Sequence, residues 1–361
     1  MSVRIPLEFS ARTLRSQELE KTLVEKHMRV CLSVDAGFET AVTVAPSEPI
    51  LAEASYLLMR SPAFDLPRWL LAELEHPGLD KGSRGELIIM TLCLQARDAA
   101  ATRLQSRMIP VNDFIQELIA PAAHDEVLRS KPIRARTSDE ADTPLQDTFR
   151  TSHMYFNHFV KFRHRKLINR TYLWRLIARG AAGLCVDFQY GIDVVVPFLY
   201  WDPVLRRDNV SALFVQGKND ETFQTVPHEY LFDMMNPYRV GFFDTNESNP
   251  VPVIRTVFAL ASTTPCVLAL KHPQRTQPPR DGAFKANFQA DKYTAFDIWC
   301  AKACHETFRP IKDDNVFQKL LLRSHVFPDV YETKKSEAIQ NATRSMNPAT
   351  DVHPAHWERF V

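Results

Sequence analysis

The chain has 361 residues, 45% hydrophobic and 24% charged, and its 44 Lys and Arg against 43 Asp and Glu leave a formal net charge of +1. This composition excludes a highly charged disordered protein and a globally basic nucleic-acid coat, so any site for a polyanion must be local. Only 10 glycines are present and none forms a G-x-G pattern, which excludes the glycine-rich phosphate loops of dinucleotide-binding and P-loop proteins.

Cysteine usage and hydropathy predict an intracellular protein, nuclear or cytoplasmic. The six cysteines are scattered, several of them inside apolar runs, as expected for buried thiols in a reducing compartment. The N-terminus lacks the apolar region of a signal peptide, and no apolar stretch approaches the roughly 20 residues that cross a bilayer. We therefore expect no membrane partner.

Residues 1–80 are expected to form a helical N-terminal segment. Apolar residues at three- and four-residue spacing predict helices over 16–31, 50–59 and 66–74. The stretch 76–85 is rich in turn residues and predicts a break in the chain.

The stretch from Glu86 to Ala101 is apolar almost all round, which predicts a helix buried inside a layered domain. Residues 131–147 mix charges with prolines and predict a surface loop within a large insertion at about 102–170. A short helix is expected over 171–179.

The chain then changes character, because β-branched and aromatic runs broken by turns predict consecutive strands. These strands are expected at 181–189, 191–201, 211–219, 253–261 and 267–270, with closing helices at 296–308 and 316–322. The sequence therefore predicts an α/β core over 81–330 and a polar C-terminal tail over 331–361.

The most informative residues lie in two of these strands. Asp193 stands near the start of one strand, and Gln216 and Lys218 lie 23 and 25 residues further on, within the next. Because side chains of a strand alternate between faces, Gln216 and Lys218 point the same way, roughly 6.6 Å apart. A buried strand would prefer Val or Ile at these positions, so the polar side chains cost stability. A chain tolerates that loss of stability more readily for function than for packing.

Hydrolysis of a phosphodiester bond needs oxygen ligands for Mg²⁺ or Mn²⁺, a source of hydroxide, and a cation beside the phosphate. Asp193 and Gln216 can supply ligands, and Lys218 the cation. Glu86, at the expected start of the buried helix, is a candidate third ligand, because an acid facing an apolar interior is otherwise costly. Its expected first-turn position would also complement the helix dipole.

The segments GELII (85–89), GIDVVV (191–196) and LFVQGKN (213–219) resemble the restriction-endonuclease-like superfamily. That pattern is a helix with Glu, a strand opening with Asp, and a next strand ending in (D/E)-x-K. The G-x-D and Q-x-K form is most similar to the archaeal-resolvase and type IV restriction branch. The wider context resembles the nuclease-like modules of fungal Crinkler-type effectors and transposon-derived proteins.

The resemblance covers residues 82–100 and about 176–262, less than a third of the chain. It implies a mixed central sheet flanked by helices in the order α-β-β-β-α-β, and a DNA nuclease. Divalent metal would lie at Asp193 and Gln216, with Lys218 orienting the attacking water.

Two departures from the family pattern leave alternatives open. An amide at Gln216 replaces the usual acid and supplies an oxygen ligand without its charge. The 107-residue gap between Glu86 and Asp193 requires a looped-out insertion, and Glu140 or Asp187 could instead supply the third carboxylate.

Residues 160–180 hold seven Lys or Arg and no acid, interleaved with aromatic residues. Such a segment in a neutral protein predicts a nucleic-acid footprint, although it could also be a solvated helix face or a counter-charge to the acidic loop at 138–142. The predicted contacts are Lys161, Arg163, Arg165, Lys166, Arg170 and Arg175.

Blander interpretations also fit the motifs. Asp193 could cap a turn, with Gln216 and Lys218 on an exposed sheet face. Cys300, Cys304 and His305 could suggest a metal site, but the second Cys or His pair of a zinc finger is missing, so buried packing is expected there. A catalytically weak nuclease-derived module that binds nucleic acid or a host protein is the main alternative function. The chain could also be the C-terminal part of an architecture with an upstream NTPase module.

Overall fold

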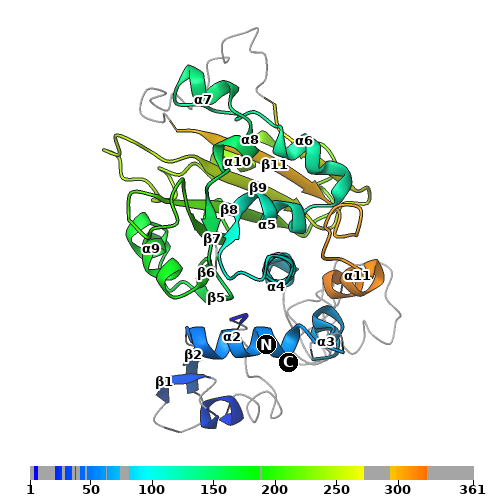
Figure 1. Ribbon diagram of the computed structural model, residues 1–361. Coiled ribbons are helices and arrows are strands. Elements are labelled where there is room, and N and C mark those ends of the chain that lie inside the picture. The colour runs from blue at the N-terminus through cyan, green and yellow to red at the C-terminus, as the bar shows by residue number, and fades with distance from the viewer. Residues whose placement is uncertain are drawn as a thin grey trace, which may run out of the picture.

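The computed structural model describes residues 4–6, 21–26, 29–34, 37, 41–44, 47–61, 63–73, 81–187, 189–271 and 293–322. Within these ranges the chain forms a mixed α/β fold, in which helices pack on a large mixed sheet (Figure 1). The expected α/β class is confirmed.

The large sheet has the strand order β10-β11-β9-β8-β7-β4-β3, and β6 also pairs with β7 and carries β5 on its other side. Its strands are β3 (Ile109–Pro110), β4 (His153–Met154), β5 (His158–Lys161), β6 (Ala181–Leu184), β7 (Val194–Leu199), β8 (Val210–Lys218), β9 (Val253–Ala259), β10 (Cys266–Ala269) and β11 (Ala295–Ala301).

Strand directions bring several strand ends to one edge of the sheet. β5 runs parallel to β6, the strands β6, β7 and β8 are successively antiparallel, and β8, β9 and β11 run parallel. The last residues of β5, β6, β8, β9 and β11 therefore lie at the same edge, where β7 begins. We call it the carboxyl edge.

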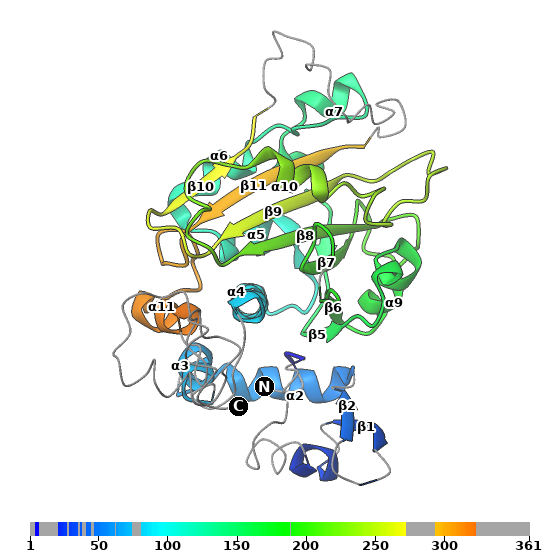
Figure 2. The ribbon, with the colours of Figure 1, turned by 180° about the vertical axis from the view of Figure 1, so that it is seen from behind.

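Helices cover both faces of the sheet. One face packs against α4 (Lys81–Leu104) and α5 (Val111–Leu118), and the other against α9 (Arg170–Ala178) and α10 (Glu229–Met234). Figures 1 and 2 show α4 lying between the sheet and the N-terminal helices α2 and α3. This burial explains why α4 is apolar almost all round.

The remaining elements are short, and in the described ranges no helix is long and apolar enough to cross a membrane. They are α2 (Pro49–Met59), α3 (Leu66–Glu73), α6 (His124–Leu128), α7 (Ser138–Asp142), α8 (Leu145–Thr148), α11 (Asp314–Leu322), the 3-10 turns η1 (Pro121–Ala123) and η2 (Arg165–Leu167), and a separate hairpin of β1 (Val30–Val34) and β2 (Ala41–Val44).

The expected helices at 50–59, 66–74, 86–101, 171–179 and 316–322 are confirmed, as are the five expected strands.

The helix expected over 296–308 is wrong, because residues 295–301 form strand β11, which lies between β10 and β9 in the sheet. All seven residues are buried, so the strand lacks the alternation of polar and apolar residues that separates a strand from a buried helix.

The expected start of the buried helix, at Glu86, is also wrong. Helix α4 begins at Lys81, inside the expected turn, so Glu86 is its sixth residue and not its first. Its charge therefore does not benefit from the first-turn dipole. The helix expected over 16–31 ends early, because β1 begins at Val30.

The expected insertion at 102–170 contributes β3, β4 and β5 to the large sheet, and the expected loop at 131–147 contains α7 and the start of α8. The tail at 331–361 lies outside the described residues.

A buried polar network ties the N-terminal residues to α4 and β5. The guanidinium of Arg4 is fully buried and donates two 2.7 Å hydrogen bonds to the carboxylate of Asp98. Its Nε donates to the carbonyl of Asn157 at 2.8 Å, and the amide of Asn157 donates to Glu53 of α2 at 2.9 Å. Each buried polar atom of these contacts thus has a partner, as stability requires.

His158 in this network should make the fold sensitive to acid. Its Nδ1 donates to Asn157 Oδ1 at 2.7 Å, and its Nε2 accepts from the hydroxyl of Ser47 at 2.9 Å. Burial and then the charges of Arg179 and Arg4 lower the pKa of His158 to about 4. The unfolded chain binds a proton near pH 6.5, so the contribution is complete above that pH and is lost as pH falls towards 4, by about 3 kcal/mol.

Urea unfolding at pH 7 and pH 4.5 checks this expectation. The His158→Gln variant should lose less stability between the two pH values than the wild-type protein. An equivalent change at the exposed His305 serves as the control. Equal pH dependence in the wild-type and His158→Gln proteins would contradict the assignment.

Candidate functional site

Asp193 immediately precedes β7 and lies beside the last residues of β8. Its backbone N donates to the carbonyl of Val215 at 3.0 Å, and its carbonyl accepts from the backbone N of Cys185 at 2.8 Å. Its carboxylate Oδ2 accepts a 2.6 Å hydrogen bond from the backbone N of Gly217. The carboxylate is therefore fixed against the residue that follows Gln216.

Gln216 and Lys218 share the orientation of Phe214, which packs on the face covered by α9 and α10. Gln216 is only 3% exposed, and its Oε1 has no hydrogen-bond partner among the described residues. The Nζ of Lys218 lies 5.6 Å from the centre of the Phe223 ring. A buried amide oxygen without a partner is costly and needs an explanation.

Glu86 lies beside the end of β8, because α4 runs antiparallel to that strand. A Cβ on Gly85 would lie 3.4 Å from Cβ of Asn219, and a Cβ on Gly217 would lie 2.5 Å from Cδ1 of Ile89. Glu86 is thus on the part of α4 that reaches the carboxyl edge. It is half-buried.

Electrostatics places Glu86 and Asp193 near one buried thiol. The pKa of Cys185 is raised well above its ordinary value by burial, then by the charges of Asp193 and Glu86. Burial also raises the pKa of Asp193, while the hydrogen bond from Gly217 and the charge of Lys218 act in the opposite direction. The charges of Glu86 and Lys218 thus act on groups at the end of β8 where Asp193 lies, whereas Gln216 faces α9 and α10, on the side of the sheet opposite α4.

Gly191 lies in the turn that precedes Asp193, and the backbone conformation of this turn requires a glycine there. Its φ is +80°, and a Cβ there would lie 2.2 Å from the carbonyl oxygen of Met234 at the end of α10. We expect Gly191→Ala to destabilise the fold by more than about 2 kcal/mol, because it combines backbone strain with a backbone clash. Thermal or urea unfolding measures the loss.

Gly241→Ala is the matched control. Gly241 has a φ of +86°, but a Cβ there would meet only the Ile168 carbonyl, at 3.6 Å. It therefore shares the strain without the clash, and Gly191→Ala should be the more destabilising change. An equal loss in both variants would show that packing against α10 does not constrain the turn.

The acidic loop at the other end of the sheet is not part of this site. Glu140 pairs with Arg136 at 2.8 Å and accepts a hydrogen bond from Thr294, which precedes β11. Asp142 of the same loop pairs with Lys131 at 2.6 Å. Glu140 and Asp142 therefore pair with neighbouring bases and not with the basic segment.

The basic segment is divided by its contacts. Lys161 pairs with Asp187 at 2.9 Å. Asp187, the other acid considered in place of Glu86, is therefore engaged in an ion pair. Arg170 pairs with Glu247 at 3.0 Å, and Arg175 is exposed on α9. These three cations lie outside the hollow formed by the rest of the segment.

Arg163, Arg165 and Lys166 line a groove of about 770 Å³, together with Tyr190 of the β6–β7 loop and Arg239, which follows α10. We call it the basic groove. Tyr190 adjoins the GID motif and could have been noticed from that position. Arg239 carries no sequence signal, because only the fold brings it beside the basic segment.

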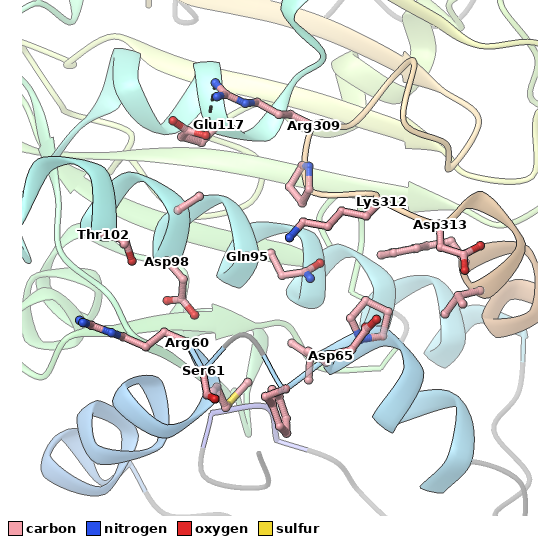
Figure 3. A pocket seen from close by; sticks show the side chains of 18 of the residues that line it. Arg60, Ser61, Asp65, Gln95, Asp98, Thr102, Glu117, Arg309, Lys312 and Asp313 are labelled. Carbon is pink, nitrogen blue, oxygen red and sulfur yellow. Dashed lines mark ion pairs between the residues drawn. The ribbon is translucent and has the colours of Figure 1, made fainter.

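A second hollow of about 800 Å³ lies between the N-terminal helices, the C-terminal half of α4 and residues 309–317 (Figure 3). Its acids are engaged in ion pairs, for example Glu117 with Arg309 at 3.3 Å and Asp313 with Arg68 at 2.7 Å. It brings together none of the residues predicted for catalysis.

A family model described as "Domain of unknown function (DUF8736)" matches residues 1–224. The match includes α4 and the strands β6 to β8, and so every residue predicted for catalysis. No curated protein and no solved structure matches the chain. Because the match spans more than half of the 361 residues, the chain belongs to the DUF8736 family.

Proposed function

We propose that the chain is a metal-dependent nuclease with a restriction-endonuclease-like core that hydrolyses phosphodiester bonds of DNA. The observation that carries this proposal is the 2.6 Å hydrogen bond from the Gly217 backbone to the carboxylate of Asp193. It joins the residue that precedes β7 to the end of β8, between Gln216 and Lys218.

The order of elements supports the proposed core. Helix α4, strands β6, β7 and β8, helix α10 and strand β9 occur along the chain in the order α-β-β-β-α-β, with the elements from β3 to α9 inserted between α4 and β6. β6, β7 and β8 form an antiparallel meander, and β9 returns parallel to β8 after α10.

The donor set fits a hard divalent cation. Asp193 and Gln216 would hold Mg²⁺ or Mn²⁺, with Glu86 as the third oxygen donor, and the buried Gln216 oxygen has no partner among the described residues. In the described part of the chain, no group of three or more His, Cys, Asp or Glu side chains is placed to hold a metal. Bound there, the ion would polarise the phosphate and lower the pKa of a coordinated water.

Lys218 supplies the cation of the site. Its charge lowers the pKa of Asp193, and in this proposal the ammonium group orients a water beside the carboxylate. It would also offset negative charge that develops on the phosphate during hydrolysis. The centre of the Phe223 ring lies 5.6 Å from the ammonium group, within the range of a cation–π interaction.

Plasmid nicking tests the function. Purified protein with Mg²⁺ or Mn²⁺ is expected to convert supercoiled plasmid to the nicked form, and excess EDTA should stop the reaction. Cleavage that persists in EDTA, or no cleavage with either metal, would reject a metal-dependent nuclease.

A second candidate function is binding of nucleic acid without cleavage. The observation that favours it is the neutral amide of Gln216, which leaves the site with less negative charge than two acids would give. Calorimetric titration with Mn²⁺ that shows no heat, together with salt-sensitive binding of an oligonucleotide, would favour this function over the nuclease.

A further inference from the structure

The basic groove lies near the proposed cleavage site. The backbone N of Phe162 donates to the carbonyl of Leu184 at 2.8 Å, and the backbone N of Cys185 donates to the carbonyl of Asp193. Neighbouring strands are about 4.8 Å apart, so Phe162 and Asp193 are separated by roughly 10 Å. Arg163, the residue after Phe162, lines the groove.

The groove carries excess positive charge. Within the described ranges, the side chains of Arg165, Lys166 and Arg239 form no ion pair. Of the two acids that line the groove, Asp187 is already paired with Lys161. Cations gathered in a concave surface attract an anion.

The groove also offers groups that suit an unpaired base. Tyr190 is 56% exposed and lies on its wall. Gln189, the preceding residue, also lines the groove. Single-stranded nucleic acid is bound by this combination of backbone cations and aromatic stacking. A duplex keeps its bases stacked inside and would leave the aromatic ring unused.

We propose that the basic groove binds a single-stranded stretch of nucleic acid, with Arg165, Lys166 and Arg239 on its phosphates and Tyr190 stacked on a base. The inference rests on the proposed function only for the cleavage site beside the groove. It names the substrate class as nucleic acid with an unpaired segment, such as an overhang, a flap or a single strand.

Fluorescence anisotropy with a labelled 20-nucleotide single strand and the matching duplex tests the proposal. The Asp193→Asn protein is used in Ca²⁺ so that binding is measured without cleavage. The single strand should bind more tightly, and three phosphate contacts predict a log-log salt slope of about −2.

Three variants separate charge from stacking. Arg239→Gln should weaken single-strand binding about tenfold at low salt and make the salt slope about 0.7 less steep. Tyr190→Ala should weaken binding at least about fivefold with an unchanged slope, because stacking releases no counterions. Arg175→Gln removes the same charge outside the groove and is the matched control.

Tighter binding of the duplex, or equal losses in Arg239→Gln and Arg175→Gln, would overturn the proposal. Competition by inorganic polyphosphate as strong as by the oligonucleotide, with no effect of Tyr190→Ala, would show a general anion site and would overturn it too. If the wild-type protein cleaves neither plasmid nor the single strand in Mg²⁺ or Mn²⁺ while these binding results hold, the proposed function falls and the groove stands. If the protein nicks plasmid but the groove variants bind like the wild-type protein, the proposed function stands and the groove proposal falls.

Discussion

The Asp193→Asn variant is expected to nick plasmid on the order of 10³-fold more slowly than the wild-type protein in Mg²⁺. The substitution keeps an oxygen that can accept the hydrogen bond from Gly217, so the turn and the strands should stay in place. It removes the charge that would hold the metal, whose stabilisation of the transition state is worth several kcal/mol. About 4 kcal/mol corresponds to that factor of 10³.

Initial rates across pH extend the test. Burial raises the pKa of Asp193, and only the ionised carboxylate would bind the metal. The wild-type rate should therefore begin to fall at a pH above the ordinary aspartate value of about 3.9. Lys218→Met should also lower the rate, by about 10² or more, because a cation beside the phosphate is lost.

Glu140→Gln is the matched control for loss of an acid, since Glu140 lies at the opposite end of the strands. Its nicking rate should stay close to that of the wild-type protein. Activity retained in both Asp193→Asn and Lys218→Met, in proteins with wild-type unfolding curves, would remove the site from the mechanism.

The strands that carry the site could be predicted because their sequences have the composition typical of strands. Residues 191–201 and 211–219 are β-branched and aromatic runs between turns, and the polar Gln216 interrupts one of them on a fixed face. Alternation fixes the relation of Gln216 to Lys218. It cannot give the register between strands, which sets Asp193 beside Gly217.

The rest of the site depends on contacts between distant segments. Helix α4 packs beside β8 although a long stretch of chain, which adds strands to the sheet, lies between them. No local sequence pattern indicates contacts between segments so far apart. Arg239 lies in the chain after α10, and only the fold brings it to the groove. Strand β11 was predicted as a helix because a strand buried on both faces shows continuous apolar character.

The ion pair between Arg255 and Asp297 should contribute strongly to the stability of the β9–β11 part of the sheet. The two residues are register partners on β9 and β11, and both side chains are only 2% exposed. Two 2.6 Å hydrogen bonds join them, and Arg255 also donates to the Phe232 carbonyl and the Tyr293 hydroxyl. Although burial disfavours the charged form, Asp297 and Tyr293 hold the pKa of Arg255 above its ordinary value.

Asp297→Asn would leave a buried guanidinium without its counter-charge, and we expect a loss of about 3–5 kcal/mol in the free energy of unfolding. Urea unfolding of Asp297→Asn, Arg255→Met and the double variant Arg255→Met/Asp297→Leu measures the coupling. The double variant should be more stable than either single variant, because it leaves no unpaired charge in the core.

The exposed pair of Arg206 and Asp202, at 2.8 Å, gives the comparison. Asp202→Asn should cost less than about 1 kcal/mol, because water screens that pair. If Asp297→Asn costs no more than Asp202→Asn, then the buried pair does not hold β9 and β11 in register. In that case their alignment must come from the apolar side chains that flank the pair on both faces of the sheet.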